Sequence, residues 1–328
     1  MNKDHSVRIL SPLDLRIPPW DLGKLRPRAC PFCGSRGTPR FERPDHLIVR
    51  ACARCGAFFV SPCPEPDLLR EFYRTYFSGH RRQELVLHRK DHFLVREMRA
   101  VEPGRDAKAR VLASVRDLHQ ARALDVGFGM GQMLLLLQKG GADVHGIDLD
   151  PKAVAFARDV LHLQNVHLGD IADIPSVERF DVITLHDLVE HPLRPLDLLR
   201  RARSLMAPGG ILSLWTPNAS FPAEDSEPTL FRVDLEHMQY MSARTCNVLA
   251  QLLDLDILHL ECLGHPDLAK IEWLSGRSPR AGRIRSTLRR TLGFLPGAIA
   301  LNAFRRQLVS EKGMRGSYHL FCIFQRHG

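Results

Sequence analysis

The sequence predicts an α/β fold, in which a parallel sheet is covered by helices on both faces, preceded by a small cysteine module. From residue 121 onward, short apolar segments typical of buried strands alternate with segments of helical periodicity. The first of these strands ends in a glycine-rich turn, over residues 125–131, that opens a helix. Upstream, residues 30–55 contain two C-x-x-C pairs.

The alternation assigns each segment by its period and its breakers. Expected strands are 121–126, 142–148, 165–168, 180–186, 211–217, 256–262 and 317–326. Expected helices are 67–77, 84–101, 106–118, 132–139, 151–162, 196–206 and 242–253. The predicted organisation is a leader over 1–27, a cysteine module over 28–62, a linker with helices over 63–118, and the α/β domain over 119–328 with a basic insertion at about 264–316.

Composition is that of a globular protein. Of the 328 residues, 44% are hydrophobic and 25% are charged, which suffices to build a sizeable core. No apolar run approaches the roughly 18 residues needed to cross a bilayer. The first twenty residues lack the continuous apolar stretch of a signal peptide, so we expect a cytoplasmic protein.

Positive charge is concentrated near the C-terminus. Residues 277–328 contain eleven Lys/Arg and one acid, Glu311, whereas the whole chain has a net charge of +9. Such a zone indicates nucleic acid, a phosphorylated substrate or a membrane surface as partner, or it is a solvated cationic helix. Within it, residues 284–308 have an apolar centre flanked by arginine pairs, and we expect peripheral membrane contact there.

Four of the eight cysteines form a pattern typical of a metal site. Cys30-x-x-Cys33-Gly and Cys52-x-x-Cys55-Gly are separated by eighteen residues. Four thiolates in two such pairs match a tetrahedral, structural zinc site, and the glycine after each pair lets backbone amides approach the sulfurs. The alternative is a redox dithiol pair.

The glycine turn indicates a nucleoside cofactor. It reads Asp125-x-Gly127-x-Gly129-x-Gly131, and the next strand ends in Asp148, whose carboxylate suits the hydroxyls of a ribose. The third glycine of a dinucleotide turn would fall at position 132, where Gln132 stands instead. An acid two residues before the first glycine suits an ammonium group, which S-adenosylmethionine carries and a pyrophosphate lacks.

These motifs resemble class I S-adenosylmethionine-dependent methyltransferases. LDVGFGMG, GIDLDP, Gly169-Asp170-Ile171, FDVITLHDLVEHP and LMAPGGILSLWTPN follow the family's order and spacing over about residues 105–262. The resemblance implies a Rossmann-like, seven-stranded sheet with helices on both faces. It places Asp125, Gly127 and Gly129 against the methionine part, Asp148 on the ribose and Asp170 on the adenine, with Ile171 beside the ring. The full implied cofactor set is Asp125, Gly127, Gly129, Gly131, Asp148, Leu149, Asp170, Ile171 and His186.

The cysteine segment and its continuation to residue 77 also look like a zinc domain found before many bacterial methyltransferases of this class. Those enzymes often act on small molecules, sugars, or cell-envelope and natural-product intermediates. The resemblance therefore implies a zinc-ribbon-like module and a small-molecule methyl acceptor. Cys63 lies outside the two pairs and is expected to pack as an ordinary buried cysteine.

Candidate catalytic histidines follow two of the expected strands. Methyl transfer to oxygen or carbon needs a base, and His186 and His191 follow the fourth strand, at the edge where open α/β sheets bind ligands. The Glu190-His191-Pro segment resembles the Glu-His of ubiquinone-biosynthesis-type O-methyltransferases, which favours His191 as the base and His186 as a pocket residue. His237 lies on a segment that often covers the acceptor in this family. Alternatively, all three histidines cap helices or pack.

The sequence thus favours methylation of a small molecule, such as a sugar, a lipid-linked or a natural-product intermediate, on oxygen. An RNA methyltransferase is the alternative, with the cysteine module and basic zone binding phosphates. Residues 186–189 lack a tetrapeptide for a flipped base, and few aromatic residues interleave the arginines. A non-catalytic adaptor is the third possibility. No feature indicates an oligomeric state.

Overall fold

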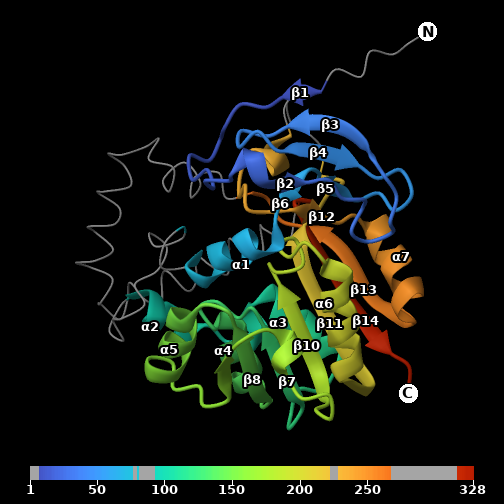
Figure 1. Cartoon of the computed structure of the whole chain (residues 1–328). Coiled ribbons are helices and arrows are strands. Elements are labelled where there is room, and N and C mark those ends of the chain that lie inside the picture. The colour runs from blue at the N-terminus through green and yellow to red at the C-terminus, as the bar shows by residue number, and fades with distance from the viewer. Residues whose placement is uncertain (1–6, 77–79, 81–92, 222–227, 267–315) are drawn as a thin grey trace.

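The computed structural model of the chain describes residues 7–76, 80, 93–221, 228–266 and 316–328 (Figure 1). Its largest unit is a seven-stranded sheet with the order β13-β14-β11-β10-β7-β8-β9. Strand β14 is antiparallel to both of its neighbours, and the other four neighbouring pairs are parallel. The strands are β7 (Arg122–Val126), β8 (Asp143–Asp148), β9 (Val166–Leu168), β10 (Phe180–His186), β11 (Met206–Pro217), β13 (Leu255–Leu263) and β14 (His319–Arg326).

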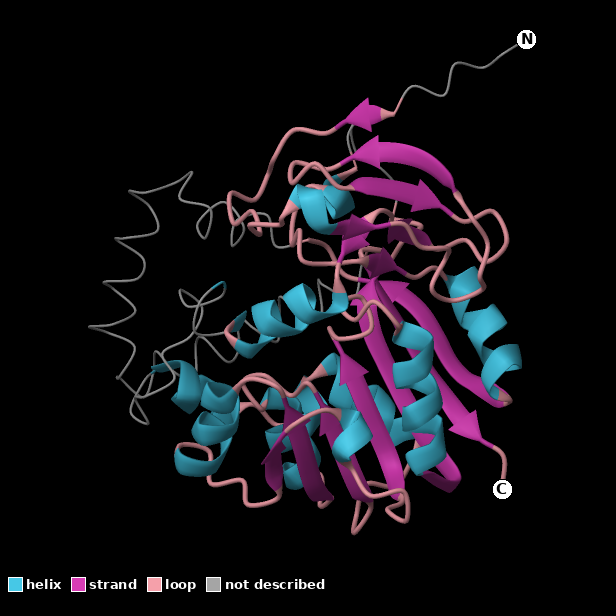
Figure 2. Ribbon diagram, viewed as in Figure 1, coloured by secondary structure: helices cyan, strands magenta, loops and turns pink. Residues whose placement is uncertain are grey.

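Helices cover both faces of this sheet, as the sequence predicted (Figure 2). One face packs with α2 (Phe93–Ala100), α3 (Ala107–Val115), α4 (Gln132–Lys139) and α5 (Pro151–Asp159). The other packs with α6 (Pro195–Leu205) and α7 (Ala243–Leu253). Local signals start the helices: the Asp150 side chain accepts from the Lys152 amide ahead of Pro151, and Ser242 forms a capping box with Thr245.

Among the element boundaries that differ from the sequence prediction, two have a clear local cause. Strand β11 begins at Met206, not at residue 211, and runs through Gly210, where a Cβ would lie 2.9 Å from the Ala207 carbonyl oxygen and 3.0 Å from that of Phe180. The Pro-Gly-Gly segment therefore allows a close strand crossing instead of ending a helix. Helix α5 ends at Asp159, because His162 adopts a left-handed conformation that buries Leu161 and Leu163 on either side of it.

A second sheet joins the N-terminal segment to the α/β domain. Its five strands have the order β1-β3-β4-β5-β12. Strand β12 comes from the chain after β11 and pairs antiparallel with β5, with Gln239 opposite Phe59 and Tyr240 opposite Phe58. The strands are β1 (Arg8–Ile9), β3 (Thr38–Glu42), β4 (Ile48–Ala51), β5 (Phe58–Val60) and β12 (Gln239–Tyr240). The domain boundaries at residues 28, 63 and 119 stay predictions, but this sheet crosses them.

The described part of the leader packs against the cysteine module. Leu10 is buried, and the Trp20 indole donates to Asp45 at 3.0 Å. Strand β2 (Leu25–Arg26) pairs with β6 (Cys63–Pro64), just before helix α1 (Pro66–Arg74). The remaining short elements are the 3₁₀ turns η1 (Leu22–Lys24), η3 (Pro103–Arg105), η4 (Ile171–Asp173) and η5 (Thr229–Phe231).

Several sequence expectations fall outside the described residues. Residues 267–315, nearly all of the basic insertion at 264–316, are not described, and this includes the expected membrane contact at 284–308. Residues 84–92, the start of the helix expected over 84–101, are also outside the described residues, and the described part of that helix is α2. In the parts of the chain that the structure describes, no helix has both the length and the apolar character to span a bilayer.

Gly146, in the middle of β8, gives a test of the packing between the sheet and α4. A Cβ at this position would lie 2.7 Å from Phe128 Cδ1 and 2.8 Å from Leu134 Cδ1. We expect Gly146→Ala to lower the free energy of unfolding by about 1–3 kcal/mol through overpacking. Denaturant titration measures this, and Gly104→Ala, whose Cβ meets no atom within 4 Å, is the control. Equal midpoints for the two variants would contradict the packing described.

Candidate functional site

The turn after β7 requires glycine. Gly127, Gly129 and Gly131 all have positive φ, at 67°, 52° and 71°. A Cβ on Gly127 would also lie 2.9 Å from Leu188 Cδ1, in the loop after β10. Backbone thus passes close to a neighbouring loop at the carboxyl edge of the sheet, where a ligand can approach bare amides.

Asp148, at the end of β8, is tied to this turn. Its Oδ2 accepts from the Gly129 amide and its Oδ1 from the Asp150 amide, each at 2.8 Å. Burial raises the pKa of Asp148 to about 6, against the opposing effect of those two amides. The acid at the predicted ribose position is therefore already held in place by the loop that precedes it.

Asp125, at the predicted methionine position, is a buried acid beside Asp148. It accepts from the Thr184 hydroxyl at 2.6 Å. Burial raises its pKa to about 7, while the Thr184 hydrogen bond and the charge of Lys108 act in the opposite direction. An ammonium group placed next to this carboxyl would favour its ionised form.

The remaining predicted cofactor positions lie at the same edge. Asp170 caps η4 by accepting from the Ala172 amide at 3.0 Å, and its side chain is exposed. Ile171 beside it is buried, and Leu149 is half-buried. The ends of β7, β8, β9 and β10 thus bring the predicted residues to one edge of the sheet, although their cofactor roles stay predictions.

His186, at the end of β10, is separate from the other candidate histidines. Its Nε2 lies 2.8 Å from Ser213 Oγ, and its ring is edge-on to Phe321. Burial lowers the pKa of His186, and Lys108 adds to this effect. The ring is therefore neutral at physiological pH, which suits a pocket wall better than a proton carrier.

His191 and His237 meet in a buried cluster. Their ring centroids are 4.8 Å apart, and one donor atom each from Glu190, His191 and His237 lie within 4.8 Å of one another. Glu190 accepts from Thr216 Oγ1 at 3.0 Å through Oε2, while Oε1 is buried with no hydrogen-bond partner among the described residues. Burial raises the pKa of Glu190, and Asp187 adds to this. We name these three residues the Glu-His cluster.

Two tyrosines complete the cluster, and sequence reasoning missed both. Tyr73 Oη lies 2.7 Å from His191 Nδ1 and donates to the Glu236 carbonyl oxygen at 3.1 Å. Tyr76 donates to Glu236 Oε1 at 2.7 Å. Both come from the segment starting at helix α1, where their spacing of three residues places them on one helical face. That spacing was the available signal.

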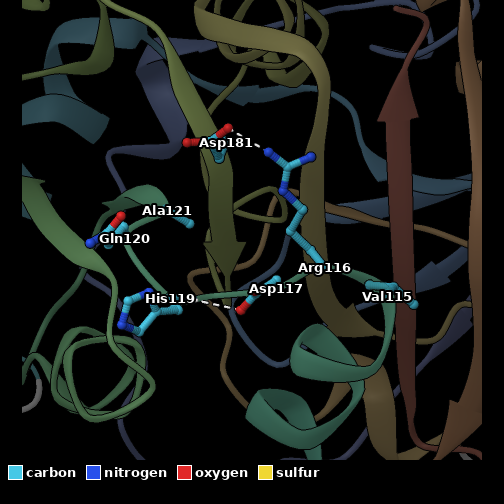
Figure 3. Close-up of a pocket in the computed structure, with 7 residues that line it drawn as sticks. All are labelled: Val115, Arg116, Asp117, His119, Gln120, Ala121 and Asp181. Carbon is cyan, nitrogen blue, oxygen red and sulfur yellow. Dashed lines mark hydrogen bonds and ion pairs between the residues drawn. The ribbon is translucent and has the colours of Figure 1, made fainter.

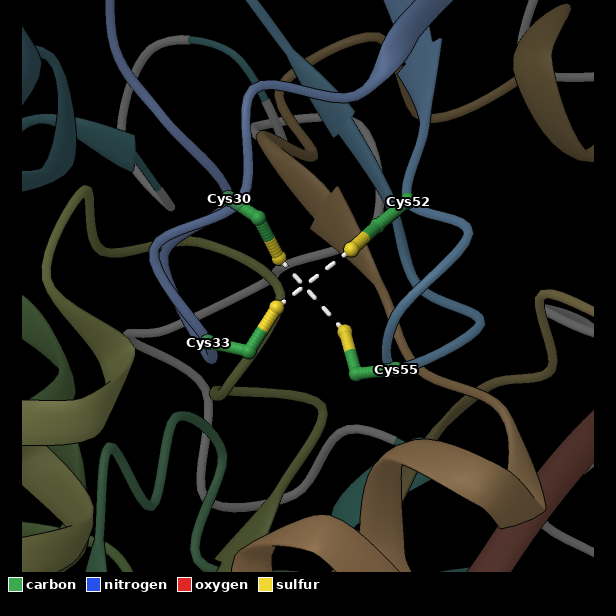
Figure 4. A group of neighbouring side chains, drawn as sticks. All are labelled: Cys30, Cys33, Cys52 and Cys55. Atoms are coloured by element: carbon green, nitrogen blue, oxygen red, sulfur yellow. Dashed lines mark hydrogen bonds between the residues drawn. The ribbon is translucent and has the colours of Figure 1, made fainter.

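The four cysteine sulfurs converge on one point, as Figure 4 shows. Cys30 Sγ lies 3.5 Å from Cys55 Sγ, and Cys33 Sγ lies 3.4 Å from Cys52 Sγ. The two knuckles repeat the same geometry, because Gly34 and Gly56 both have φ of 76° and each donates its amide to the carbonyl of the first cysteine of its pair. Each of the two sulfur–sulfur distances given above joins cysteines from different pairs.

Burial raises the pKa of Cys33, and the hydrogen bond with Cys30 raises that of Cys55. A hydrogen bond with Cys55 lowers the pKa of Cys30 to about 5, against the effect of burial. Tetrahedral zinc with Zn–S bonds of about 2.3 Å would place sulfurs about 3.8 Å apart, close to the observed spacing. The four side chains thus fit such an ion.

A further cavity lies away from these groups (Figure 3). It has a volume of about 440 Å³ and sits where β7 and β10 begin, at the opposite end of the sheet from the glycine turn. The Arg116–Asp181 ion pair, at 2.6 Å, crosses it. Its lining residues are Val115, Arg116, Asp117, His119, Gln120, Ala121 and Asp181. None of the predicted site residues lines this cavity.

Comparison with curated proteins gives partial matches. The chain is 38% identical to the ubiquinone biosynthesis O-methyltransferase of Xanthomonas campestris pv. campestris (strain B100) over 106 residues, which is 30% of this chain and 44% of that protein. It is 32% identical to the Histophilus somni (strain 2336) protein of the same name over 116 residues, 32% of this chain and 49% of that protein. The chain thus spans less than half the length of these relatives.

Among solved structures, the chain is similar to Burkholderia thailandensis 1,6-didemethyltoxoflavin-N1-methyltransferase. The sequence identity is 13%, the TM-score is 0.48, and the match covers 89% of this chain and 100% of that one.

A family profile described as a methyltransferase domain matches residues 87–260. That match covers more than half of the chain and includes β7 to β12 with the glycine turn and the Glu-His cluster. The chain therefore belongs to the methyltransferase-domain family, among the class I S-adenosylmethionine-dependent methyltransferases.

Proposed function

We propose that the chain transfers a methyl group from S-adenosylmethionine to an oxygen atom of a small molecule. The observation that carries this proposal is the buried Glu-His cluster, two members of which follow β10 at the sheet edge that also carries the glycine turn. Names of the curated relatives refer to O-methylation in ubiquinone biosynthesis, which supports an oxygen acceptor.

The donor side is formed by two acids and the bare turn. Asp125 would take the ammonium group of the cofactor, Asp148 its ribose hydroxyls, and Asp170 with Ile171 the adenine. When bound, the cofactor supplies a methyl group activated by a sulfonium. The chain's own part is to hold donor and acceptor in line in a site that excludes water.

The acceptor side supplies a base. If Tyr73 gives its proton to the Glu236 carbonyl, then His191 Nδ1 must carry the proton in the His191–Tyr73 hydrogen bond, because a hydroxyl has only one proton to donate. His191 Nε2 is then the unprotonated nitrogen. We propose His191 or His237 as the base that takes the acceptor's hydroxyl proton, with His186 in the pocket wall.

Burial favours a small acceptor over RNA. His191 and His237 are 8% and 6% exposed, so only a molecule that enters the site can contact them. A proposal of RNA or membrane binding depends on the basic insertion at 264–316, most of which lies outside the described residues. The described residues offer no support for either partner.

We also propose a structural zinc ion at Cys30, Cys33, Cys52 and Cys55. Four sulfurs at tetrahedral spacing leave no position for a substrate, so the ion would hold the module together. Thiolates kept as metal ligands suit a reducing compartment, which supports a location in the cytoplasm.

Cofactor affinity should depend on pH through Asp125 and Asp148. Because their pKa values are about 7 and 6, both bind protons as the pH falls and stop accepting from the ligand. We expect the affinity for S-adenosylhomocysteine to fall about tenfold between pH 8 and 6, and more steeply below. Calorimetry across this range measures it, and a flat profile would contradict the assignment.

Asp125→Asn should weaken cofactor binding and stabilise the folded protein at pH 8. The folded pKa of about 7 exceeds the unfolded value, so Asp125 contributes stability that is present below about pH 4 and lost as the pH rises through 7. At pH 8 the variant should therefore unfold at a higher temperature than the wild type, with a difference that vanishes toward pH 4, and bind S-adenosylhomocysteine at least about tenfold more weakly. Scanning calorimetry and titration calorimetry measure the two effects, with Asp159→Asn, on the exposed end of α5, as control.

Metal analysis tests the zinc site. Wild-type protein should contain one zinc per chain, and Cys33→Ser/Cys52→Ser should lose it and melt at a lower temperature. Cys63→Ser, buried outside the group, should keep it. Carboxylate and imidazole donors also suit divalent cations. A second equivalent that persists in the cysteine variant and is lost in His237→Gln would therefore place an ion in the Glu-His cluster.

Turnover tests the base. With catechols, phenols and hydroxylated sugars as acceptors, we expect release of S-adenosylhomocysteine, lowered about a hundredfold or more by His191→Gln or His237→Gln. Affinity for S-adenosylhomocysteine should stay within about twofold, and His145→Gln, on β8, should behave as wild type. Methylation of total RNA with no small-molecule turnover would overturn the proposal.

A further inference from the structure

A buried arginine of the cysteine module reaches the segment that carries His237. Arg43 follows β3 and has no exposed surface. Its guanidinium donates to the His237 carbonyl oxygen and to the Leu235 carbonyl oxygen, both at 2.5 Å, and to the Tyr240 hydroxyl at 3.2 Å. These acceptors lie on both sides of His237 along the chain, so a single side chain fixes that stretch of backbone.

Asp45 is the ion-pair partner of this arginine. Its carboxylate accepts from Arg43 Nε at 3.0 Å and from Nη2 at 2.5 Å. Burial alone lowers the pKa of Arg43, but the Asp45 carboxylate and the Tyr240 hydroxyl outweigh it, and the net shift is upward. A buried ion pair is often no more stable than well-packed apolar residues of similar size. The pair therefore indicates a role besides stability. The hydrogen bonds of Arg43 other than those to Asp45 all go to residues 235–240.

The segment is held from its other side as well. The Met238 and Gln239 amides donate to the Glu190 carbonyl oxygen, at 2.8 and 3.3 Å, next to His191. A second arginine of the module, Arg28, donates to the Met238 and Leu193 carbonyl oxygens. Both histidine-bearing loops are thus bonded to each other and to the cysteine module.

We propose that Arg43, paired with Asp45, is a positioning residue that fixes His237 against His191 and Glu190. The cysteine module is then a wall of the acceptor site instead of a separate recognition domain. The catalytic meaning of this placement rests on the proposed function, but the placement itself can be tested without an acceptor.

Two variants remove the anchor in different ways. Arg43→Lys keeps a charge beside Asp45, but its three N–H donors lack the planar fork of a guanidinium and cannot serve Asp45 and all three acceptors on the segment together. Arg43→Met/Asp45→Leu removes the buried pair as a whole, a change that proteins often tolerate. The control is Arg50→Met on β4, which removes a guanidinium bonded only to the Arg36 and Gly37 carbonyl oxygens within the module.

The readout is the ring of His237 in full-length, zinc-loaded protein labelled with ¹⁵N-histidine. Its signals are identified by His237→Gln, and those of His145, which pairs with Asp143 on β8, serve as internal reference. We expect the His237 signals to shift or broaden in both Arg43 variants and to stay in place in Arg50→Met, with His145 unchanged in all. Amide exchange over 235–241 should speed up about tenfold or more in the Arg43 variants only.

Three results would overturn the proposal. The first is an unchanged His237 signal and exchange rate in folded Arg43 variants. The second is an equal shift of His145, and the third is loss of folding in both variants, since either would show a general structural role. Titration with S-adenosylhomocysteine is a separate arm: the Arg43 variants should bind within about twofold of wild type. If the wild type itself does not bind, the proposed function fails while the positioning of His237 is still decided by the spectra.

Discussion

The pairing of β12 with β5 is the contact on which the arrangement of the site depends. Only two residues long, β12 joins the sheet of the cysteine module, while the Met238 and Gln239 amides just before and within it bond to the Glu190 carbonyl of the methyltransferase domain. His237 stands one residue before this double attachment. The position of a candidate base is therefore set both by the sheet of the module and by the turn after β10, and neither the module nor the domain alone would define it.

Buried acidic side chains lie along the carboxyl edge of the seven-stranded sheet. Asp125, Asp148 and Glu190 are all buried acids with raised pKa values, and burial is the leading cause in each. In a fold selected for stability alone such groups would be replaced or paired with cations, because a desolvated carboxylate is costly. Their concentration at the carboxyl ends of β7, β8 and β10 is typical of a site whose ligands complete the electrostatics.

The sequence was sufficient for whatever depends on local pattern. The alternation of strand and helix periods located the seven strands. Spacing identified the glycine turn and the two cysteine pairs, and Figure 4 shows the four cysteines in one group. It missed whatever depends on contacts between distant segments. A two-residue strand such as β12 has no period to read, and the Tyr73–His191 contact joins residues 118 positions apart. Leader packing was missed for the same reason, since Trp20 is held by Asp45.

Two arginines of the cysteine module are directed at the methyltransferase domain. A nucleic-acid module presents its cations outward, where phosphates can reach them. Here Arg43 is wholly buried and Arg28 donates to carbonyls of Val60, Leu193 and Met238, whereas Arg36, Arg40 and Arg54 are exposed. The cysteines share a core with Leu249 of α7, and the Cys55 carbonyl accepts from Thr245 in the first turn of that helix. The module thus directs two arginines and part of its apolar surface at the methyltransferase domain, which supports the proposal that it forms a wall of the acceptor site.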